Sequence, residues 1–256
     1  MANNYSILAL DFDGVICDGM KEYFHSSWLV YSQIWSIPAA PAPTELFSTF
    51  ARLRPLIEHG WEMPLLLWAL QQNTPEELIA DDWTNLASQI LAEHQLTPPD
   101  VVEVLDEVRD RSIRHDLQSW LNLQNCYPGT IAKLLALPPT VQPVIITTKD
   151  GRFTRQLLED QGVQLAADAI FGKEKKQSKA DTLRQLITSQ PNQIWFVEDR
   201  LPTLQIVSQQ PDLDSVQLFL ADWGYNTPAE RSTAQQDDRV QLLSIEQFCQ
   251  DQSSWT

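Results

Sequence analysis

The pattern of hydrophobic and polar positions divides the chain into two kinds of segment. Near the N-terminus, the apolar run 6–10 is short and leads directly into acids, which predicts a buried strand of a parallel sheet. From about residue 19 to 124, large apolar residues recur at near-helical spacing, for example Tyr23, Trp28, Tyr31 and Trp35. From about residue 125 onward, short apolar runs alternate with helical patterns, which predicts strands near 143–147, 169–171, 194–198 and 216–221.

This alternation predicts an α/β fold with a doubly wound, parallel, five-stranded sheet, that is, a Rossmann-like core. The helical stretch interrupts the core. We therefore expect a discontinuous core domain of residues 1–18 and 125–256, and an inserted α-helical domain of residues 19–124. The polar tail from Gln250 is rich in Gln, Asp and Ser, and we expect it to be frayed.

The first strand ends in Asp11-Phe12-Asp13-Gly14. Ligands of open α/β sheets bind just beyond the carboxyl ends of such strands. Two carboxylates at that place can hold a hard cation through oxygen, and one of them can act as a nucleophile. Gly14 would let the backbone turn sharply and approach a substrate. On its own, this tetrapeptide fits equally a solvated turn in which acids simply end a strand.

Three further segments carry chemically useful side chains. They supply a hydroxyl pair after one strand, a lysine cluster before a helix and an acid pair at the end of another strand: Thr147 and Thr148; Lys175, Lys176 and Lys179; Glu198 and Asp199. With the first acid pair, this order resembles that of the haloacid dehalogenase-like hydrolase superfamily throughout the core. The chain is most similar to the branch that holds phosphoglycolate phosphatase and β-phosphoglucomutase. The segments 127–130 and 221–225 resemble that branch's return from cap to core and its turn after the last strand.

The resemblance implies a catalytic role for several of these residues. Asp11 would attack phosphorus and form an aspartyl phosphate, and Asp13 would protonate the leaving oxygen and later activate the hydrolytic water. Family members that cleave carbon–halogen bonds typically lack the second acid, so Asp13 favours phosphoryl transfer. Thr147 would donate a hydrogen bond to a phosphoryl oxygen, with Thr148 as the alternative because the strand register is open by about one residue.

The lysine and the metal site also follow from the resemblance. Lys179 would be the catalytic lysine, with Lys175 and Lys176 as competitors. Mg²⁺ would be bound by the side chain of Asp11, the backbone carbonyl of Asp13, and Asp199 directly or through water.

Glu198 would be an outer or alternative ligand of this metal. The family often has Gly-Asp at this place and another acid four residues later, whereas this chain has Glu198-Asp199 and then Thr203. Capping of the following helix is the other interpretation of these two acids.

Composition narrows the range of partners. The net charge is −16, from 34 acids against 18 bases, which disfavours binding to nucleic acids and to anionic membranes. No apolar run approaches the roughly 18 residues of a membrane span, and the N-terminus lacks the pattern of a secretory signal. Cys17, Cys126 and Cys249 are widely spaced, which favours reduced thiols in a cytoplasmic protein. We expect a monomer or a homodimer.

Together with these observations, the resemblance implies a magnesium-dependent phosphatase that acts on a small phosphorylated metabolite, with residues 19–124 as a mobile cap that sets specificity. A phosphosugar mutase, which uses the same residues but shields the aspartyl phosphate from water, is the closest alternative, and the motifs do not separate the two. A catalytically idle binding or regulatory protein that keeps the fold is a third hypothesis, which the complete set of acids counts against.

Overall fold

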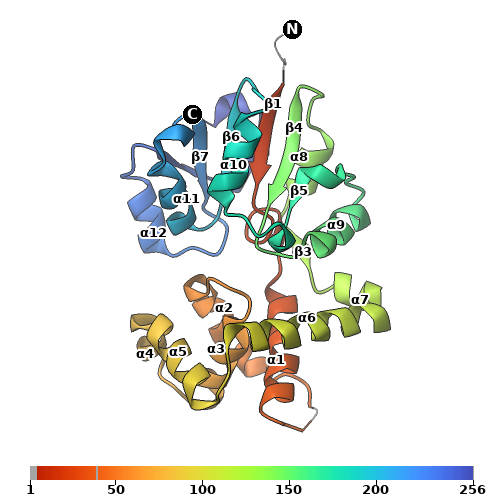
Figure 1. The fold of residues 1–256 in the computed structure, drawn as a ribbon, viewed down its shortest axis with the longest axis vertical. Helices are drawn as coiled ribbons and strands as arrows, with labels where there is room; N and C mark the ends of the chain where they lie inside the picture. The colour runs from red at the N-terminus through yellow and green to blue at the C-terminus, as the bar shows by residue number, and fades with distance from the viewer. Residues whose placement is uncertain (1–4, 39, 256) are drawn as a thin grey trace. The chain divides into compact units, whose positions relative to one another are not determined.

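The computed structural model describes residues 5–38 and 40–255 and contains a six-stranded sheet flanked by helices (Figure 1). The strands lie in the order β5-β4-β1-β6-β7-β8, and all neighbouring pairs are parallel. The chain therefore leaves β1 towards β4 and β5 on one side and returns to β6, β7 and β8 on the other. The strands are β1 (Ser6–Leu10), β4 (Val141–Ile146), β5 (Ile170–Phe171), β6 (Ile194–Glu198), β7 (Val216–Ala221) and β8 (Val240–Leu243).

The predicted doubly wound, parallel α/β sheet is confirmed, but the predicted count of five strands is wrong by one. The missed strand, β8, lies at the edge of the sheet beside β7. It has four residues, and its second residue, Gln241, is exposed, so the sequence offers too short an apolar run to predict a strand. The segment 221–225 consequently follows β7 and not the last strand.

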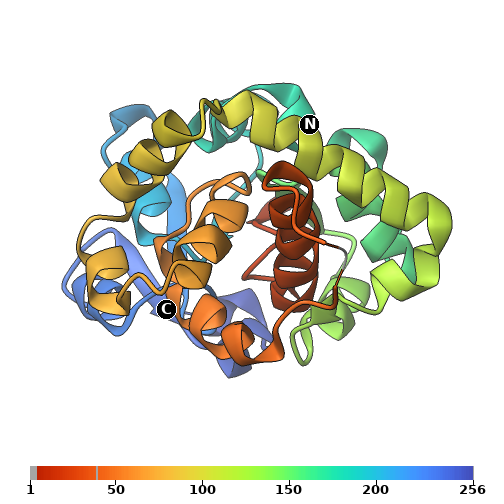
Figure 2. The same ribbon diagram turned by 90° about the horizontal axis from the view of Figure 1, so that it is seen from below.

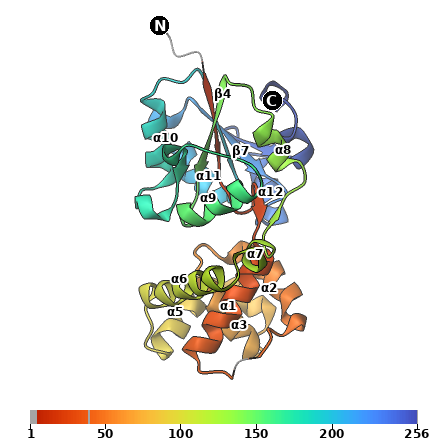
Figure 3. The ribbon, with the colours of Figure 1, turned by 90° about the vertical axis from the view of Figure 1, so that its right-hand side faces the viewer.

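Helices lie on both faces of this sheet (Figure 3). Helices α10, α11 and α12 contribute Leu183, Leu204 and Ala234 to a core that also contains Phe196 of β6 and Leu218 of β7. Burial from both faces explains why the central strands are continuous apolar runs. The helices of this unit are α8 (Thr130–Leu135), α9 (Gly151–Asp160), α10 (Lys179–Ile187), α11 (Leu201–Ser208), α12 (Pro228–Ala234) and α13 (Ile245–Phe248).

Two short segments form an antiparallel pair that the sequence did not predict, β2 (Cys17–Asp18) and β3 (Asn125–Cys126). Cys17 lies opposite Cys126, and Asp18 lies opposite Asn125. The chain divides into two compact units after Asp18 and after Gln124, where the sequence places the ends of the inserted segment. The pair therefore joins the two places at which the chain passes from one unit to the other.

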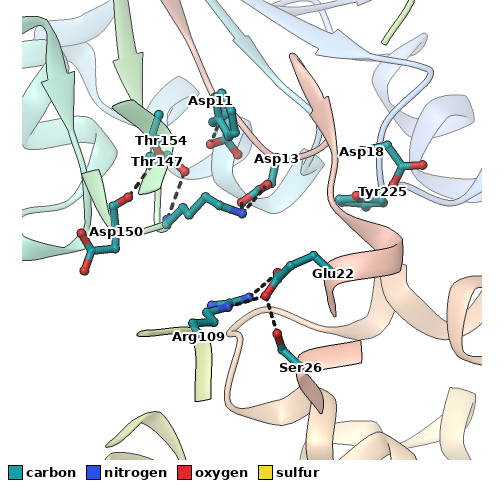
Figure 4. Close-up of polar contacts among 12 residues, drawn as sticks. Asp11, Asp13, Asp18, Glu22, Ser26, Arg109, Thr147, Asp150, Thr154 and Tyr225 are labelled. Carbon is teal, nitrogen blue, oxygen red and sulfur yellow. Dashed lines mark hydrogen bonds and ion pairs between the residues drawn. The ribbon is translucent and has the colours of Figure 1, made fainter. Parts of the chain in front are cut away.

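The regular elements described between residues 19 and 124 are all helical (Figure 2). The two longest, α1 and α6, pack against each other. A buried ion pair links them: Arg109 of α6 donates two hydrogen bonds of 2.8 Å to Glu22 of α1, which also accepts one from Ser26 (Figure 4). The helices are α1 (Met20–Ile34), α2 (Phe47–Leu53), α3 (Glu62–Gln71), α4 (Glu76–Asp81), α5 (Trp83–Glu93), α6 (Pro98–His115) and α7 (Leu117–Leu121). Within residues 5–38 and 40–255, no helix combines the length and the hydropathy needed to cross a membrane.

The described part of the C-terminal tail, residues 250–255, packs against the core, which contradicts the prediction that it is frayed there. Trp255 is only 3% exposed, and its ring centroid lies 5.2 Å from that of Phe219 and 5.5 Å from that of Phe248. A single aromatic side chain buries a large apolar area, and it anchors a tail whose composition is otherwise polar.

Candidate active site

The carboxyl ends of β1, β4 and β6 bring the predicted site residues together. Strand β1 lies between β4 and β6, where the strand order reverses and where ligands of such sheets bind. Asp11 and Asp13 follow β1, and Thr147 follows β4 (Figure 4). Lys179 is the first residue of α10, and Glu198 is the last residue of β6.

Asp11 is a buried carboxylate with fixed partners. Its backbone N–H donates to the carbonyl of Val197 on β6 (2.9 Å), and its Oδ1 accepts the N–H of Phe12 (2.7 Å). Its Oδ2 lies 2.9 Å from Nζ of Lys179. Burial raises the pKa of Asp11 to about 7; the charge of Lys179 opposes this rise, and the charges of Glu198 and Asp13 add to it. The side chain is therefore poised between its acid and its carboxylate form near neutral pH.

Lys179 joins two of the acids. Besides Asp11, its Nζ contacts Oε2 of Glu198 at 2.5 Å. Burial opposes the charge of this lysine, but the two carboxylates outweigh burial, so its pKa is raised above the usual value and the side chain remains an ammonium group. Ser178 fixes its position by capping α10, accepting the N–H of Asp181. The competing candidates Lys175 and Lys176 are exposed, so Lys179 is the lysine that the structure brings to the acids.

Three carboxylates form the part of the site that could hold a metal ion. Asp11, Glu198 and Asp199 each offer an oxygen, and these oxygens lie within 4.8 Å of one another. Glu198 has one oxygen on Lys179 and accepts the N–H of Arg200 with the other (3.1 Å). Burial raises the pKa of Glu198, with Lys179 acting against the rise.

Asp199 is oriented by the turn that follows β7. Its Oδ2 accepts the N–H of Tyr225 (2.7 Å), and its backbone carbonyl accepts a hydrogen bond from Asn226 (2.9 Å). Two glycines make room for it: a Cβ on Gly14 would lie 2.0 Å from its Oδ2, and a Cβ on Gly224 would lie 2.3 Å from its Cβ. Gly14 also has a φ of 86°, a conformation that favours glycine. The structure places this residue against Asp199, whereas the sequence suggested contact with substrate.

The donor set fits a hard divalent cation. All three candidate ligands are carboxylates, the type of ligand that Mg²⁺ and Ca²⁺ take. Together with Asp13, the site has four carboxylates and the ammonium groups of Lys179 and Lys149, so two negative charges remain when all of them are ionised. A divalent cation would balance that charge.

The two threonines that follow β4 differ in burial. Thr147 is buried, its N–H donates to the carbonyl of Phe171 (2.9 Å), and its Oγ1 accepts the N–H of Lys149 (3.1 Å). Because Oγ1 accepts in that bond, its own proton is left to donate to a ligand. Thr148, the alternative candidate, is exposed.

Lys149 is a site residue that the sequence interpretation missed. Its Nζ lies 3.1 Å and 3.3 Å from the two carboxylate oxygens of Asp13. The side chains are 2% and 15% exposed, so this is a largely buried ion pair. The available signal was its place three residues beyond a strand that ends at the same edge as β1. A long lysine side chain at that place can equally reach solvent, so the pattern alone does not assign it to the site.

Comparisons with known proteins support the fold. No protein-family model and no curated protein matches the sequence significantly. Solved structures match over nearly the whole chain. A haloacid dehalogenase-like hydrolase family protein from Streptococcus pneumoniae has 14% identity and a TM-score of 0.58, with 96% of each chain covered. A predicted phosphatase from Clostridium acetobutylicum has 16% identity and the same TM-score of 0.58 and coverage of 96%. A predicted phosphoglycolate phosphatase from Haemophilus somnus has 16% identity and a TM-score of 0.60, with 93% of each chain covered. The resemblance to haloacid dehalogenase-like hydrolases is thus confirmed at the level of the fold.

Proposed function

We propose that this protein is a phosphatase that hydrolyses a small phosphorylated metabolite through an aspartyl phosphate on Asp11. The observation that carries the proposal is the setting of this one carboxylate. It is buried at the reversal point of the sheet, lies 2.9 Å from a lysine ammonium, and shares a cluster of oxygen donors with Glu198 and Asp199. A nucleophile, a positive charge for phosphoryl oxygens and a cation site are the parts that phosphoryl transfer needs.

The chain's own residues divide the work of two displacements. In the first, a carboxylate oxygen of Asp11 forms a bond to phosphorus while the bond to the leaving oxygen breaks, and Asp13 gives that oxygen a proton. In the second, Asp13 takes a proton from a water molecule that attacks the aspartyl phosphate, which releases phosphate and restores Asp11. Lys179 and the hydroxyl of Thr147 would bind the anionic phosphoryl oxygens.

Asp11 and Asp199 would hold Mg²⁺, with Glu198 beside them, its two oxygens already engaged by Lys179 and Arg200. When bound, the cation neutralises phosphoryl charge and favours the ionised form of the nearby carboxylates. The strongly acidic chain repels nucleic acids and anionic membranes, so we propose a small phosphorylated substrate and neither of these as a partner. We propose a cytoplasmic location from the three widely spaced cysteines.

The proposal is tested by measuring phosphate release from a panel of phosphorylated metabolites, with Mg²⁺ and with excess chelator. We expect release with Mg²⁺ only, and a loss of at least about a thousandfold in Asp11→Asn, because an amide is a poor nucleophile. The exposed Asp168→Asn serves as the matched control. Full activity in chelator, or in Asp11→Asn, would contradict the proposal. Isomerisation of a phosphosugar with a bisphosphate activator would indicate the mutase, and failure to form a metal-dependent beryllium fluoride adduct would indicate an idle protein.

A further inference from the structure

Besides Lys179, Lys149 is a second lysine of the core unit that is buried in an ion pair, here with Asp13. Lys173, Lys175 and Lys176 are exposed, whereas the side chain of Lys149 is only 2% exposed. A lysine that gives up its hydration needs a partner of opposite charge. Both carboxylate oxygens of Asp13 supply it, at 3.1 Å and 3.3 Å.

The backbone of Lys149 is fixed on both sides. Its N–H donates to Oγ1 of Thr147 (3.1 Å), and its carbonyl accepts the N–H of Lys173 (3.0 Å). The ammonium group also lies 6.0 Å from the ring centroid of Phe12, within the range of a cation–π contact. Lys149 is therefore a rigid support, held by the end of β4 and by the segment that follows β5.

Asp13 needs such a support because it stands in a turn among other acids. It lies two residues beyond Asp11, and Asp11 in turn shares a cluster with Glu198 and Asp199. Repulsion from these groups would turn an unpaired Asp13 carboxylate away from them. The two contacts to one ammonium group fix the direction of the carboxylate instead.

We propose that Lys149 is a positioning residue that aims the carboxyl group of Asp13 at the leaving oxygen. This inference rests on the phosphatase function proposed above. A proton donor works only when it is within hydrogen-bond reach of the atom it serves, so misdirection of Asp13 slows the departure of the leaving group. In this role Lys149 acts through Asp13.

The test uses two substrates of similar shape, phenyl phosphate and p-nitrophenyl phosphate. Phenolate is a poor leaving group that needs a proton, whereas the nitro group lets p-nitrophenolate leave without one. The ratio of kcat/KM for the two substrates reports the proton donor, because kcat/KM covers the steps up to departure of the leaving group. We expect Lys149→Met to lose at least about tenfold more on phenyl phosphate than on p-nitrophenyl phosphate, as general acids contribute about a hundredfold or more.

Four further variants make the result decisive. Asp13→Asn should show the same substrate ratio, and the double variant should be no worse than Asp13→Asn, because two residues that act as one unit are not additive. Lys149→Arg keeps the charge and should restore part of the ratio, and it serves if Lys149→Met does not fold. The exposed Lys175→Met should match the wild type.

Equal losses on both substrates in a folded Lys149 variant, or additive losses in the double variant, would overturn the positioning role and leave the phosphatase function standing. Absence of phosphate release in the wild type would instead overturn the phosphatase function itself. The two failures are therefore distinguishable.

Discussion

Asp11 shows the electrostatic cost of burying a carboxylate, here the proposed nucleophile, inside a protein. Its carboxylate is buried, and burial together with Glu198 and Asp13 disfavours its charge more than Lys179 favours it. The folded, metal-free protein therefore holds a proton on Asp11 more tightly than the unfolded chain does. A group with a raised folded pKa stabilises the fold at low pH, and this contribution is lost as the pH rises.

The first prediction concerns the stability of Asp11→Asn in metal-free buffer. The pKa of Asp11 is about 7 in the folded state and 3.8 ordinarily, so the wild type should lose stability between about pH 4 and 7, whereas an amide does not titrate. The free energy of unfolding of the variant relative to the wild type should rise by about 3 kcal/mol from pH 5 to pH 8, since one pKa unit corresponds to about 1.36 kcal/mol. Denaturant unfolding with chelator measures it, with Asp168→Asn as the control. A difference that stays constant with pH would contradict the raised pKa.

The residues of the site were predictable where backbone geometry places them. Asp11, Thr147 and Glu198 stand at the ends of adjacent parallel strands, and such ends meet at one edge of the sheet. The distinction between Thr147 and Thr148 was not predictable, because the strand ends there and alternation no longer assigns a side. Lys149 was missed because a long, flexible side chain can reach solvent or a distant acid, and the sequence pattern does not say which.

At the scale of elements, the connecting strands β2 and β3 place two thiols side by side. The N–H of Tyr127 donates to the carbonyl of Ile16 (2.9 Å), which flanks the pair. Cys17 and Cys126 are therefore a non-hydrogen-bonded pair, in which the Cα atoms lie about 4.5 Å apart. That spacing is within the range of about 4.4–6.8 Å that a disulfide spans.

The second prediction is that diamide links Cys17 to Cys126. The hydrogen bond from Cys17 lowers the pKa of Cys126, which is half-buried, so Cys126 should react first. The hydrogen bond between Cys17 and Cys126, together with burial, raises the pKa of Cys17. The sulfur of Cys17 then attacks the sulfur of Cys126 and displaces the bound reagent. One disulfide forms, and diamide takes up the two hydrogen atoms. Mass spectrometry of peptides should find this link, and Cys126→Ser should abolish it while Cys249→Ser leaves it. A link to Cys249 in place of Cys17 would contradict the register of β2 and β3.

Elements were predictable from the sequence in proportion to their length and burial. The central strands are apolar because they are buried from both faces, and the long helices of residues 19–124 repeat their aromatic residues at helical spacing. The elements β2, β3 and β8 have two to four residues each and are only partly buried, so neither period could be recognised. The equally short β5 was predicted because both of its residues are apolar and buried. The C-terminal tail was mispredicted for a related reason. Its composition is polar, but the single buried residue Trp255 is enough to pack it against the core.

At the scale of the whole molecule, the chain is a core unit with a helical unit inserted between Asp18 and Asn125. The residues of the proposed chemistry all belong to the core unit. We therefore propose that the helical unit serves substrate selection, as a cap that closes over the site and excludes water. The solved structures that share the fold are covered over more than nine-tenths of their length, so they have counterparts of both units.

The last prediction is that the core unit keeps its hydrolytic activity, but loses substrate discrimination, when the helical unit is removed. Asp18 and Asn125 are direct partners in the β2–β3 pair, so a short turn such as Asn-Gly can replace residues 19–124 without displacing either strand. The trimmed protein should hydrolyse p-nitrophenyl phosphate, because Asp11, Asp13, Thr147 and Lys179 remain. It should lose discrimination among phosphorylated metabolites, because the side chains that would contact the leaving group are gone. Circular dichroism checks the fold, and Asp11→Asn in the trimmed protein checks that the residual activity comes from the same site. A folded, trimmed protein that ranks the metabolites as the full-length protein does would show that the helical unit has another role.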